Sequence, residues 1–309
     1  MLLPDANGYF LRPPPGKIGD ARALVLIQGA ASPPEGYRPI VEKIQAGVSF
    51  PLWVGVPEFL FNTPEPGRLF RAKIDGTLHT MRSAGMAASK MAILAHSLGG
   101  IFAQQHIISS NASECDALVI YGSTLLRKYR LEPPLLSTPL LTLDGTLDGL
   151  LRITRQAEAK WHEQRSNSTL HRVVLLSGLN HWSISSGPAP ANVREHDLPA
   201  EVSESQGHTA IAKAVAAFLT SHFADEAQER AAAEVALETA SHTTREIVAP
   251  LIKALEKEGN RHLHPPCNSD YPTNPTCEYP RWPRASLGPP RPPARLHGAS
   301  RGCRETRRA

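Results

Sequence analysis

The chain alternates short, fully apolar runs with longer segments in which apolar residues recur at helical spacing. From Ala23 onward the runs are rich in Val, Ile and Leu, and they are apolar at successive rather than alternate positions. Strands that are buried on both faces of a sheet have this pattern. It predicts strands at Ala23–Ile27, Leu52–Val56, Met91–Ala95, Ala117–Tyr121, Leu140–Leu143 and Val173–Leu176.

Helix-length segments separate the predicted strands. They cover Tyr37–Ala46, Phe70–Ser89, Gly99–Ser109 and Leu151–Ser166, and a fifth helix follows the last strand at Ser205–His222. Alternation of this kind favours a mostly parallel sheet with helices on both faces. Gly8–Leu11 is predicted as a short edge strand, and the connection Gly122–Pro139 is too short for a lid domain.

The two ends of the chain differ from this middle part. Residues 1–20 are rich in Pro and Gly. An Ala- and Glu-rich stretch predicts two amphipathic helices, Ala224–Ala240 and Thr243–Lys257, the second interrupted by Pro250. From Leu263 the chain is rich in Pro, Arg and Gly without periodicity, which is typical of disorder. We therefore expect an N-terminal segment (1–20), an α/β domain (21–223), a helical extension (224–260) and a largely disordered tail (261–309).

The net charge of +4 is unevenly distributed. Residues 260–309 hold nine Arg against three acidic residues, which leaves a slight excess of acid in the rest of the chain. The basic pI therefore gives no ground for nucleic-acid binding by the α/β domain. No apolar run is long enough to form a transmembrane segment.

The compartment stays open, with the secretory pathway as the working hypothesis. The first residues lack the layout of a signal peptide. Asn111-Ala-Ser113 and Asn167-Ser-Thr169 are glycosylation sequons. Cys267 and Cys277, in a Pro-rich stretch, predict a local disulfide, and Cys115 is expected to be a small core residue.

A serine between small residues follows the apolar run at Met91–Ala95. The stretch reads Ala95-His-Ser97-Leu-Gly99. A nucleophile on a sharp strand-to-helix turn needs small neighbours, because its backbone is strained and the flanking residues press against the adjacent strand and helix. Ser97 is therefore the candidate nucleophile and Gly99 closes the G-x-S-x-G pattern, with Ala95 where the first glycine is usual.

Two later strands are followed by the residue types that activate a serine. Asp144-Gly-Thr-Leu-Asp148 follows one strand and Gly178-Leu-Asn-His181 follows the next. A serine nucleophile needs a base that takes its proton and an acid that orients the base. The carboxyl ends of parallel strands meet at one edge of a sheet, so His181 and either Asp144 or Asp148 can reach Ser97. The order Ser, Asp, His is that of one triad class.

With these three motifs in their strand contexts, residues 21–223 resemble an α/β-hydrolase. In such enzymes the acid commonly lies in a Gly-x-x-Asp motif, here Gly145-Thr-Leu-Asp148, which favours Asp148 over Asp144. The resemblance implies an α/β-hydrolase fold. The short connection and the Ala- and Glu-rich stretch described above add that it lacks a lid domain and carries a C-terminal helical extension.

The resemblance also implies an oxyanion hole made of two backbone N–H groups. One belongs to Leu98, directly after the nucleophile, and the other to Ala30, or Ala31 beside it, in the loop after the first strand. Gln28-Gly29 stands there in place of the His-Gly that the family often has.

The implied activity is hydrolysis of a small-molecule carboxylic ester through an acyl-enzyme, without cofactor or metal. Tyr37 and Trp182 are expected to contact the substrate, which favours an apolar, lipid-like ester and a lipase- or esterase-like enzyme. A peptidase or acyltransferase with the same triad is an alternative, and so is a catalytically silent binding protein. Taken singly, a Ser or Asp at a strand end is a turn former and His181 a buried core histidine. The conjunction of three motifs in order favours catalysis. The oligomeric state stays open.

Overall fold

We describe residues 3–5, 8–109, 115–130, 136–166 and 170–257 of the computed structural model. The sequons at Asn111 and Asn167, the predicted Cys267–Cys277 disulfide and the predicted tail lie outside the described residues.

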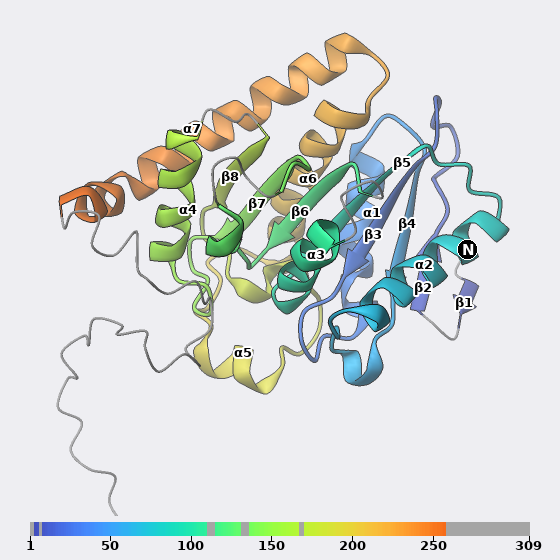
Figure 1. The fold of residues 1–309 in the computed structure, drawn as a ribbon, viewed down its shortest axis with the longest axis horizontal. Helices are drawn as coiled ribbons and strands as arrows, with labels where there is room; N and C mark the ends of the chain where they lie inside the picture. Colours follow the sequence, from blue (N-terminus) through green and yellow to red (C-terminus); the bar gives the residue numbers. More distant parts are fainter. Residues whose placement is uncertain (1–2, 6–7, 110–114, 131–135, 167–169, 258–309) are drawn as a thin grey trace, which may run out of the picture.

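Eight strands form one sheet in the order β1-β2-β4-β3-β5-β6-β7-β8 (Figure 1). From β3 to β8 neighbouring strands pair in parallel, whereas β2 pairs antiparallel with β4 and β1 antiparallel with β2. The strands are β1 (Leu3–Asp5), β2 (Gly8–Leu11), β3 (Arg22–Ile27), β4 (Leu52–Pro57), β5 (Lys90–His96), β6 (Ala117–Tyr121), β7 (Leu140–Gly145) and β8 (His171–Leu176). The six parallel strands are the six that the apolar runs predict.

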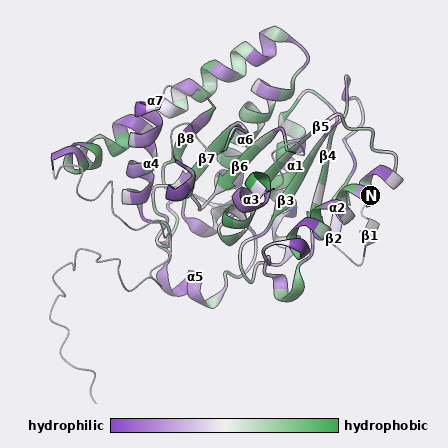
Figure 2. Ribbon diagram, viewed as in Figure 1, coloured by the Kyte–Doolittle hydropathy of each residue, from purple (hydrophilic) through white to green (hydrophobic). Residues whose placement is uncertain are grey.

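Helices cover both faces of the sheet. Helices α1 (Arg38–Gly47) and α6 (Glu204–Phe223) pack on one face, and α2 (Arg68–Ser83) and α3 (Leu98–Ser109) pack on the other. Along β3, Leu24 and Leu26 point into the first core, while Val25 and Ile27 point into the second. This two-sided burial explains why the strands are apolar at successive positions. Figure 2 accordingly shows the strands mostly in green. The architecture is the α/β-hydrolase fold that the sequence predicts.

A long helix closes the β8 edge of the sheet. Helix α7 (Ala227–Lys257) packs on α6, on β8 and on α4 (Ile153–Arg165). The sequence predicts two helices here, with a gap at residues 241–242 and an interruption of the second helix at Pro250, but α7 is one helix that continues through both places. The reason is that its buried residues stay on one face on either side of the proline; they are Ala233, Leu237, Ser241, Thr244, Val248 and Ile252.

Short elements complete the fold, and the sequence analysis places none of them. Within the described part of the chain they are α5 (Ala191–His196) and four 3₁₀ helices, η1 (Pro34–Tyr37), η2 (Leu60–Asn62), η3 (Arg127–Tyr129) and η4 (His181–Ile184). No helix among the described residues has the length and apolar character needed to cross a membrane.

Candidate active site

Ser97 lies on a strained turn between β5 and α3. Its φ of +52° is in the left-handed region, which a serine rarely adopts. Its backbone N–H donates to the Tyr121 carbonyl on β6 at 2.8 Å, which helps to hold the turn. A local conformation of this cost persists only where the surroundings enforce it, and such sites cluster at active centres.

Small residues around Ser97 are required by close packing. A Cβ at Gly99 would lie 2.5 Å from the Gln28 carbonyl oxygen. One at Gly100 would lie 2.9 Å from the Ser123 Cβ. The turn is thus wedged between the ends of β3 and β6. Ala95, where the usual motif has glycine, is fully buried and places its methyl group in the core beneath α2 and α3.

Asp148 and His181 form a buried pair. The His181 Nδ1 lies 2.6 Å from the Asp148 Oδ2. The other carboxylate oxygen, Oδ1, accepts the backbone N–H groups of Leu150 at 2.8 Å and Leu151 at 2.6 Å. With Nδ1–H donating to the carboxylate, the imidazole is held in the tautomer that leaves Nε2 free to accept a proton.

Asp144, the other candidate acid, makes its hydrogen bonds to groups other than His181. It is fully buried, its Oδ1 accepts the Gly145 N–H at 2.8 Å, and its Oδ2 contacts the Gln156 amide. Burial, followed by the nearby Asp148 carboxylate, raises the pKa of Asp144 well above its usual range. Of the two carboxylates, the structure therefore brings Asp148 to the base.

Ser97 and His181 both border the end of β6. Gly122, at φ +61°, leaves room for the imidazole, because a Cβ there would lie 2.7 Å from the His181 Cε1. Within the described residues neither the Ser97 hydroxyl nor the His181 Nε2 makes a hydrogen bond. Contacts between a nucleophile and its base often tighten only when substrate binds.

The loop after β3 leaves one N–H group unpaired. The Gly29 N–H donates to the Tyr37 hydroxyl and the Ala31 N–H donates to the Thr63 hydroxyl, each at 3.0 Å. The Ala30 N–H between them has no acceptor among the described residues. Leu98 begins α3, so its N–H lacks an acceptor within the helix and lies at the positive end of the helix dipole. Ala30 and Leu98 are therefore the free donors on either side of the turn.

A hydrogen-bonded chain joins this loop to the backbone of His181. The Tyr37 hydroxyl accepts from Gly29 and donates to the His96 Nδ1 at 2.8 Å. The His96 Nε2–H then donates to the His181 carbonyl at 3.1 Å. Burial lowers the pKa of His96 well below its usual range and raises that of Tyr37 to about 12, so both groups stay neutral.

The same contacts correct the expectation for Tyr37. It has no solvent-exposed surface, and its hydroxyl is used within the chain. Tyr37 therefore supports the loop from behind and is not placed to touch a substrate. Gln28 is equally buried, and its amide has no partner among the described residues. Tyr37 and Thr63, not the residue in the usual His position, hold the loop.

Asp197, just after α5, is a site residue that the sequence analysis misses. Its carboxylate accepts the N–H groups of Gly149 at 3.0 Å, His181 at 3.2 Å and Trp182 at 3.1 Å. It thereby ties the loop that carries Asp148 to the loop that carries His181. The half-buried Trp182 donates its indole N–H to the Gly187 carbonyl at 2.9 Å.

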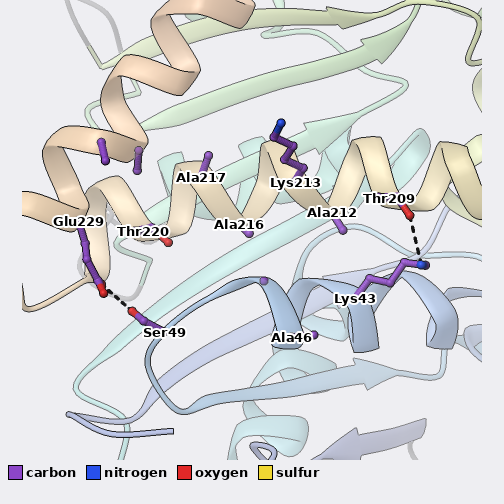
Figure 3. A pocket seen from close by; sticks show the side chains of 13 residues that line it. Lys43, Ala46, Ser49, Thr209, Ala212, Lys213, Ala216, Ala217, Thr220 and Glu229 are labelled. Carbon is purple, nitrogen blue, oxygen red and sulfur yellow. Dashed lines mark hydrogen bonds between the residues drawn. The ribbon is translucent and has the colours of Figure 1, made fainter.

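A groove among the described residues lies away from these groups. It has a volume of about 730 Å³ and lies between α1, α6 and the start of α7 (Figure 3). Alanine is the most frequent residue in its walls, and Lys43, Lys213 and Glu229 are among the polar residues. It extends to Ser49, beside the start of β4 and thus near the edge opposite Ser97. The described residues contain no group of three or more His, Cys, Asp or Glu that could hold a metal ion.

No family model matches the sequence, and no curated protein matches it at a significant level. Several solved structures have a similar backbone fold. A soluble variant of monoglyceride lipase from Saccharomyces cerevisiae, in complex with a substrate analogue, is 9% identical with a TM-score of 0.48. That match covers 72% of this chain and 94% of the lipase.

Two bacterial structures are similar at the same level. LpqC, a poly(3-hydroxybutyrate) depolymerase from Bordetella parapertussis, is 16% identical with a TM-score of 0.45, covering 73% of this chain and 87% of its own. Poly(aspartic acid) hydrolase-1 from Sphingomonas sp. KT-1 is 17% identical with a TM-score of 0.44, covering 69% and 96%. Similarity this distant carries no information on substrate, and the α/β-hydrolase fold of this chain follows from its own strand order.

Proposed function

We propose that this protein is a serine hydrolase that cleaves a carboxylic ester with Ser97, Asp148 and His181. One observation carries the proposal. A serine at φ +52° on a strand-to-helix turn shares one edge of the sheet with a buried Asp148–His181 pair. A strained serine and an oriented imidazole have no common structural purpose, whereas together they are what acyl transfer requires.

In the proposed reaction, the His181 Nε2 takes the proton of Ser97 as its Oγ attacks the ester carbonyl. The tetrahedral oxyanion accepts the N–H groups of Ala30 and Leu98. His181 then gives its proton to the leaving alkoxide, which departs as the alcohol. Water adds to the acyl-enzyme in the same way, His181 returns the proton to Ser97, and the acid is released.

We propose an apolar ester as the substrate. Trp182 directly follows the proposed base and is half-buried, so its ring can cover an acyl or alcohol chain next to the reacting carbon. The peptidase and acyltransferase alternatives use the same three residues. A peptidase would cleave an amide in place of the ester, and an acyltransferase would pass the acyl group to an acceptor other than water.

A fluorophosphonate probe tests the nucleophile. The wild-type protein should be labelled, and Ser97→Ala should abolish labelling together with hydrolysis of p-nitrophenyl esters. Ser49→Ala, at the opposite end of the molecule, should behave as wild type. If well-folded protein takes no label, the hydrolase is contradicted and the hypothesis of a catalytically silent binding protein remains. Labelling without hydrolysis of any chain length would point to the peptidase or acyltransferase.

The two carboxylates supply the matched control for the triad. Asp148→Asn should lower kcat by about 10³–10⁴, because the amide favours the wrong imidazole tautomer. Asp144→Asn should retain most activity, since Asp144 does not touch His181. The opposite ranking of these two variants would refute the assignment of the acid.

A further inference from the structure

Large apolar side chains exposed to solvent are concentrated near the edge of the sheet that carries Ser97. Seven such residues occur among the described ones, and four of them lie on segments that follow the carboxyl ends of strands. We call these four, Leu60, Phe61, Leu69 and Leu198, the apolar rim. The other three lie elsewhere: Ile18 before β3, Leu170 before β8 and Val235 on α7.

The rim is presented outward by a strained and hydrogen-bonded loop. Phe61 is 85% exposed, and both Phe61 and Asn62 have φ above +50°. The Asn62 carbonyl accepts the Ser32 N–H at 3.0 Å, and the Thr63 hydroxyl, which holds Ala31, donates to the Phe61 carbonyl at 3.1 Å. Leu60 and Phe61 are thus fixed to the loop that contains Ala30. Backbone strain that exposes a phenylalanine has no benefit for the core.

Leu198 flanks the opposite end of the site. Its carbonyl accepts the Asn180 side-chain N–H at 2.6 Å, next to His181. Figure 1 shows the light-blue segment before α2 and the helix α5, which precedes Leu198, at the same lower edge of the molecule. Five strand intervals separate β4 from β8, or about 24 Å. The rim therefore has members on both sides of Ser97.

We propose that the apolar rim inserts into the surface of an uncharged or zwitterionic lipid layer and so presents Ser97 to esters held there. The inference rests on the proposed function and narrows its substrate class to esters at an interface. Projecting phenylalanine and leucine side chains fit a fluid layer, into which each can be buried separately.

A protein partner fits this geometry less well. The rim comes from three separate segments around the site, so a rigid partner that covered all of it would also cover Ser97. Charged residues of both signs accompany the rim, including Glu58, Glu65 and Arg68. Attachment therefore does not depend on anionic headgroups.

Vesicle binding tests the rim without chemistry. Ser97→Ala protein is sedimented with phosphatidylcholine vesicles at 0.15 M salt. These vesicles carry no net charge, so the Arg-rich residues 260–309 find no anionic surface to bind. Adding Phe61→Ser should lower the partition coefficient about tenfold or more, the loss expected for one buried aromatic side chain. Leu60→Ser with Phe61→Ser should lower it further. Ile18→Ser, at a residue of 86% exposure away from the rim, should leave it unchanged.

A kinetic comparison completes the test. With Ser97 intact, Phe61→Ser should leave hydrolysis of a short soluble ester within about twofold of wild type and slow that of an emulsified long-chain ester about tenfold. Absent vesicle binding, or equal losses in the Ile18 and Phe61 variants, would overturn the proposal. Rim-dependent binding by a protein that takes no fluorophosphonate label would support attachment of the rim to lipid and contradict the hydrolase, and with it the delivery of esters to Ser97. Protein that takes the label but does not bind vesicles would support the hydrolase and contradict attachment of the rim to lipid.

Discussion

Tyr37 connects the loop after β3 to the residue that precedes the proposed nucleophile. Its hydroxyl is the only hydrogen-bond partner of the Gly29 N–H and of the His96 Nδ1 among the described residues. Both groups are buried, so losing that hydroxyl leaves a donor and an acceptor unpaired at once. The cost falls on the loop that carries Ala30 and on the His96 contact to the His181 backbone.

Tyr37→Phe is therefore predicted to lower the free energy of unfolding by about 1–3 kcal/mol. It should also lower kcat, with a smaller change in KM. Tyr9→Phe is the matched control, because the Tyr9 hydroxyl is buried without a partner among the described residues. Removing that hydroxyl should leave stability and activity unchanged or slightly improve stability. Urea unfolding and ester hydrolysis measure both variants. Equal effects of the two substitutions would contradict the role of Tyr37.

Sequence spacing could indicate the residues that carry a motif, and only those. Ser97, Asp148 and His181 each follow an apolar strand within a few residues, which is a local pattern. Tyr37 and Asp197 instead accept hydrogen bonds from backbone N–H groups of other loops, such as those of Gly29 and Gly149. No fixed spacing in the sequence relates the partners. No periodicity records such contacts, so Tyr37 was expected at the substrate and Asp197 was not expected at all.

Helix α7 protects the outer edge of the sheet. The Leu175 N–H on β8 donates to the Thr244 hydroxyl of α7 at 2.8 Å, and the Val173 N–H donates to the Glu163 carboxylate of α4 at 3.0 Å. These groups point away from β7 and would otherwise be open to pairing with another chain. Helices α4 and α7 thus supply hydrogen-bond acceptors to the outer edge of β8, the strand that precedes the loop of His181.

Thr244→Val should destabilise the protein by about 1–3 kcal/mol, because the Leu175 N–H then stays buried without an acceptor. Thr243→Val is the control, since that exposed hydroxyl bonds only within its own helix. Thermal unfolding and light scattering follow the two variants. Aggregation above the wild-type level is expected for the first and not for the second. A Thr244 variant as stable as wild type would show that the edge needs no such partner.

Elements with strong periodicity were predictable, and elements defined by tertiary contacts were not. Every parallel strand was expected within two residues at either end, because two-sided burial forces a continuous apolar run. The expected gap at residues 241–242 does not occur, because α7 is one helix. Pro250 does not end it either, since packing of Val248 and Ile252 beside β8 holds the helix across the proline. Helix α5 spans only six residues with a single buried side chain, which is too little pattern to recognise.

At the scale of the whole molecule, buried histidines link folding to pH. Burial lowers the pKa of His96, His171, His208 and His222 below the usual value. For each of them the unfolded chain binds a proton at a higher pH than the folded protein does. The free energy of unfolding therefore falls as pH drops through about 6.5. Asp144 has a raised pKa in the folded protein, so it alone would make the free energy of unfolding rise as pH drops. It is one group against four histidines.

Urea unfolding is thus predicted to show lower stability at pH 5.5 than at pH 7.5. His208→Phe should weaken this dependence, because His208 is buried and its Nε2 has no partner among the described residues. Circular dichroism at a series of pH values gives the slope for both proteins. A flat profile between these pH values, or an unchanged slope in the variant, would contradict the prediction.

The order of the strands along the chain also separates the proposed catalytic groups in time. Ser97 follows a central strand, whereas Asp148 and His181 follow the last two strands. During translation at about 5–20 residues per second, His181 leaves the ribosome several seconds after Ser97. The nascent chain therefore carries its serine without a base until β8 is complete. If the proposed triad is correct, the serine gains its base, and with it its reactivity, only after β8 and the loop of His181 have been made.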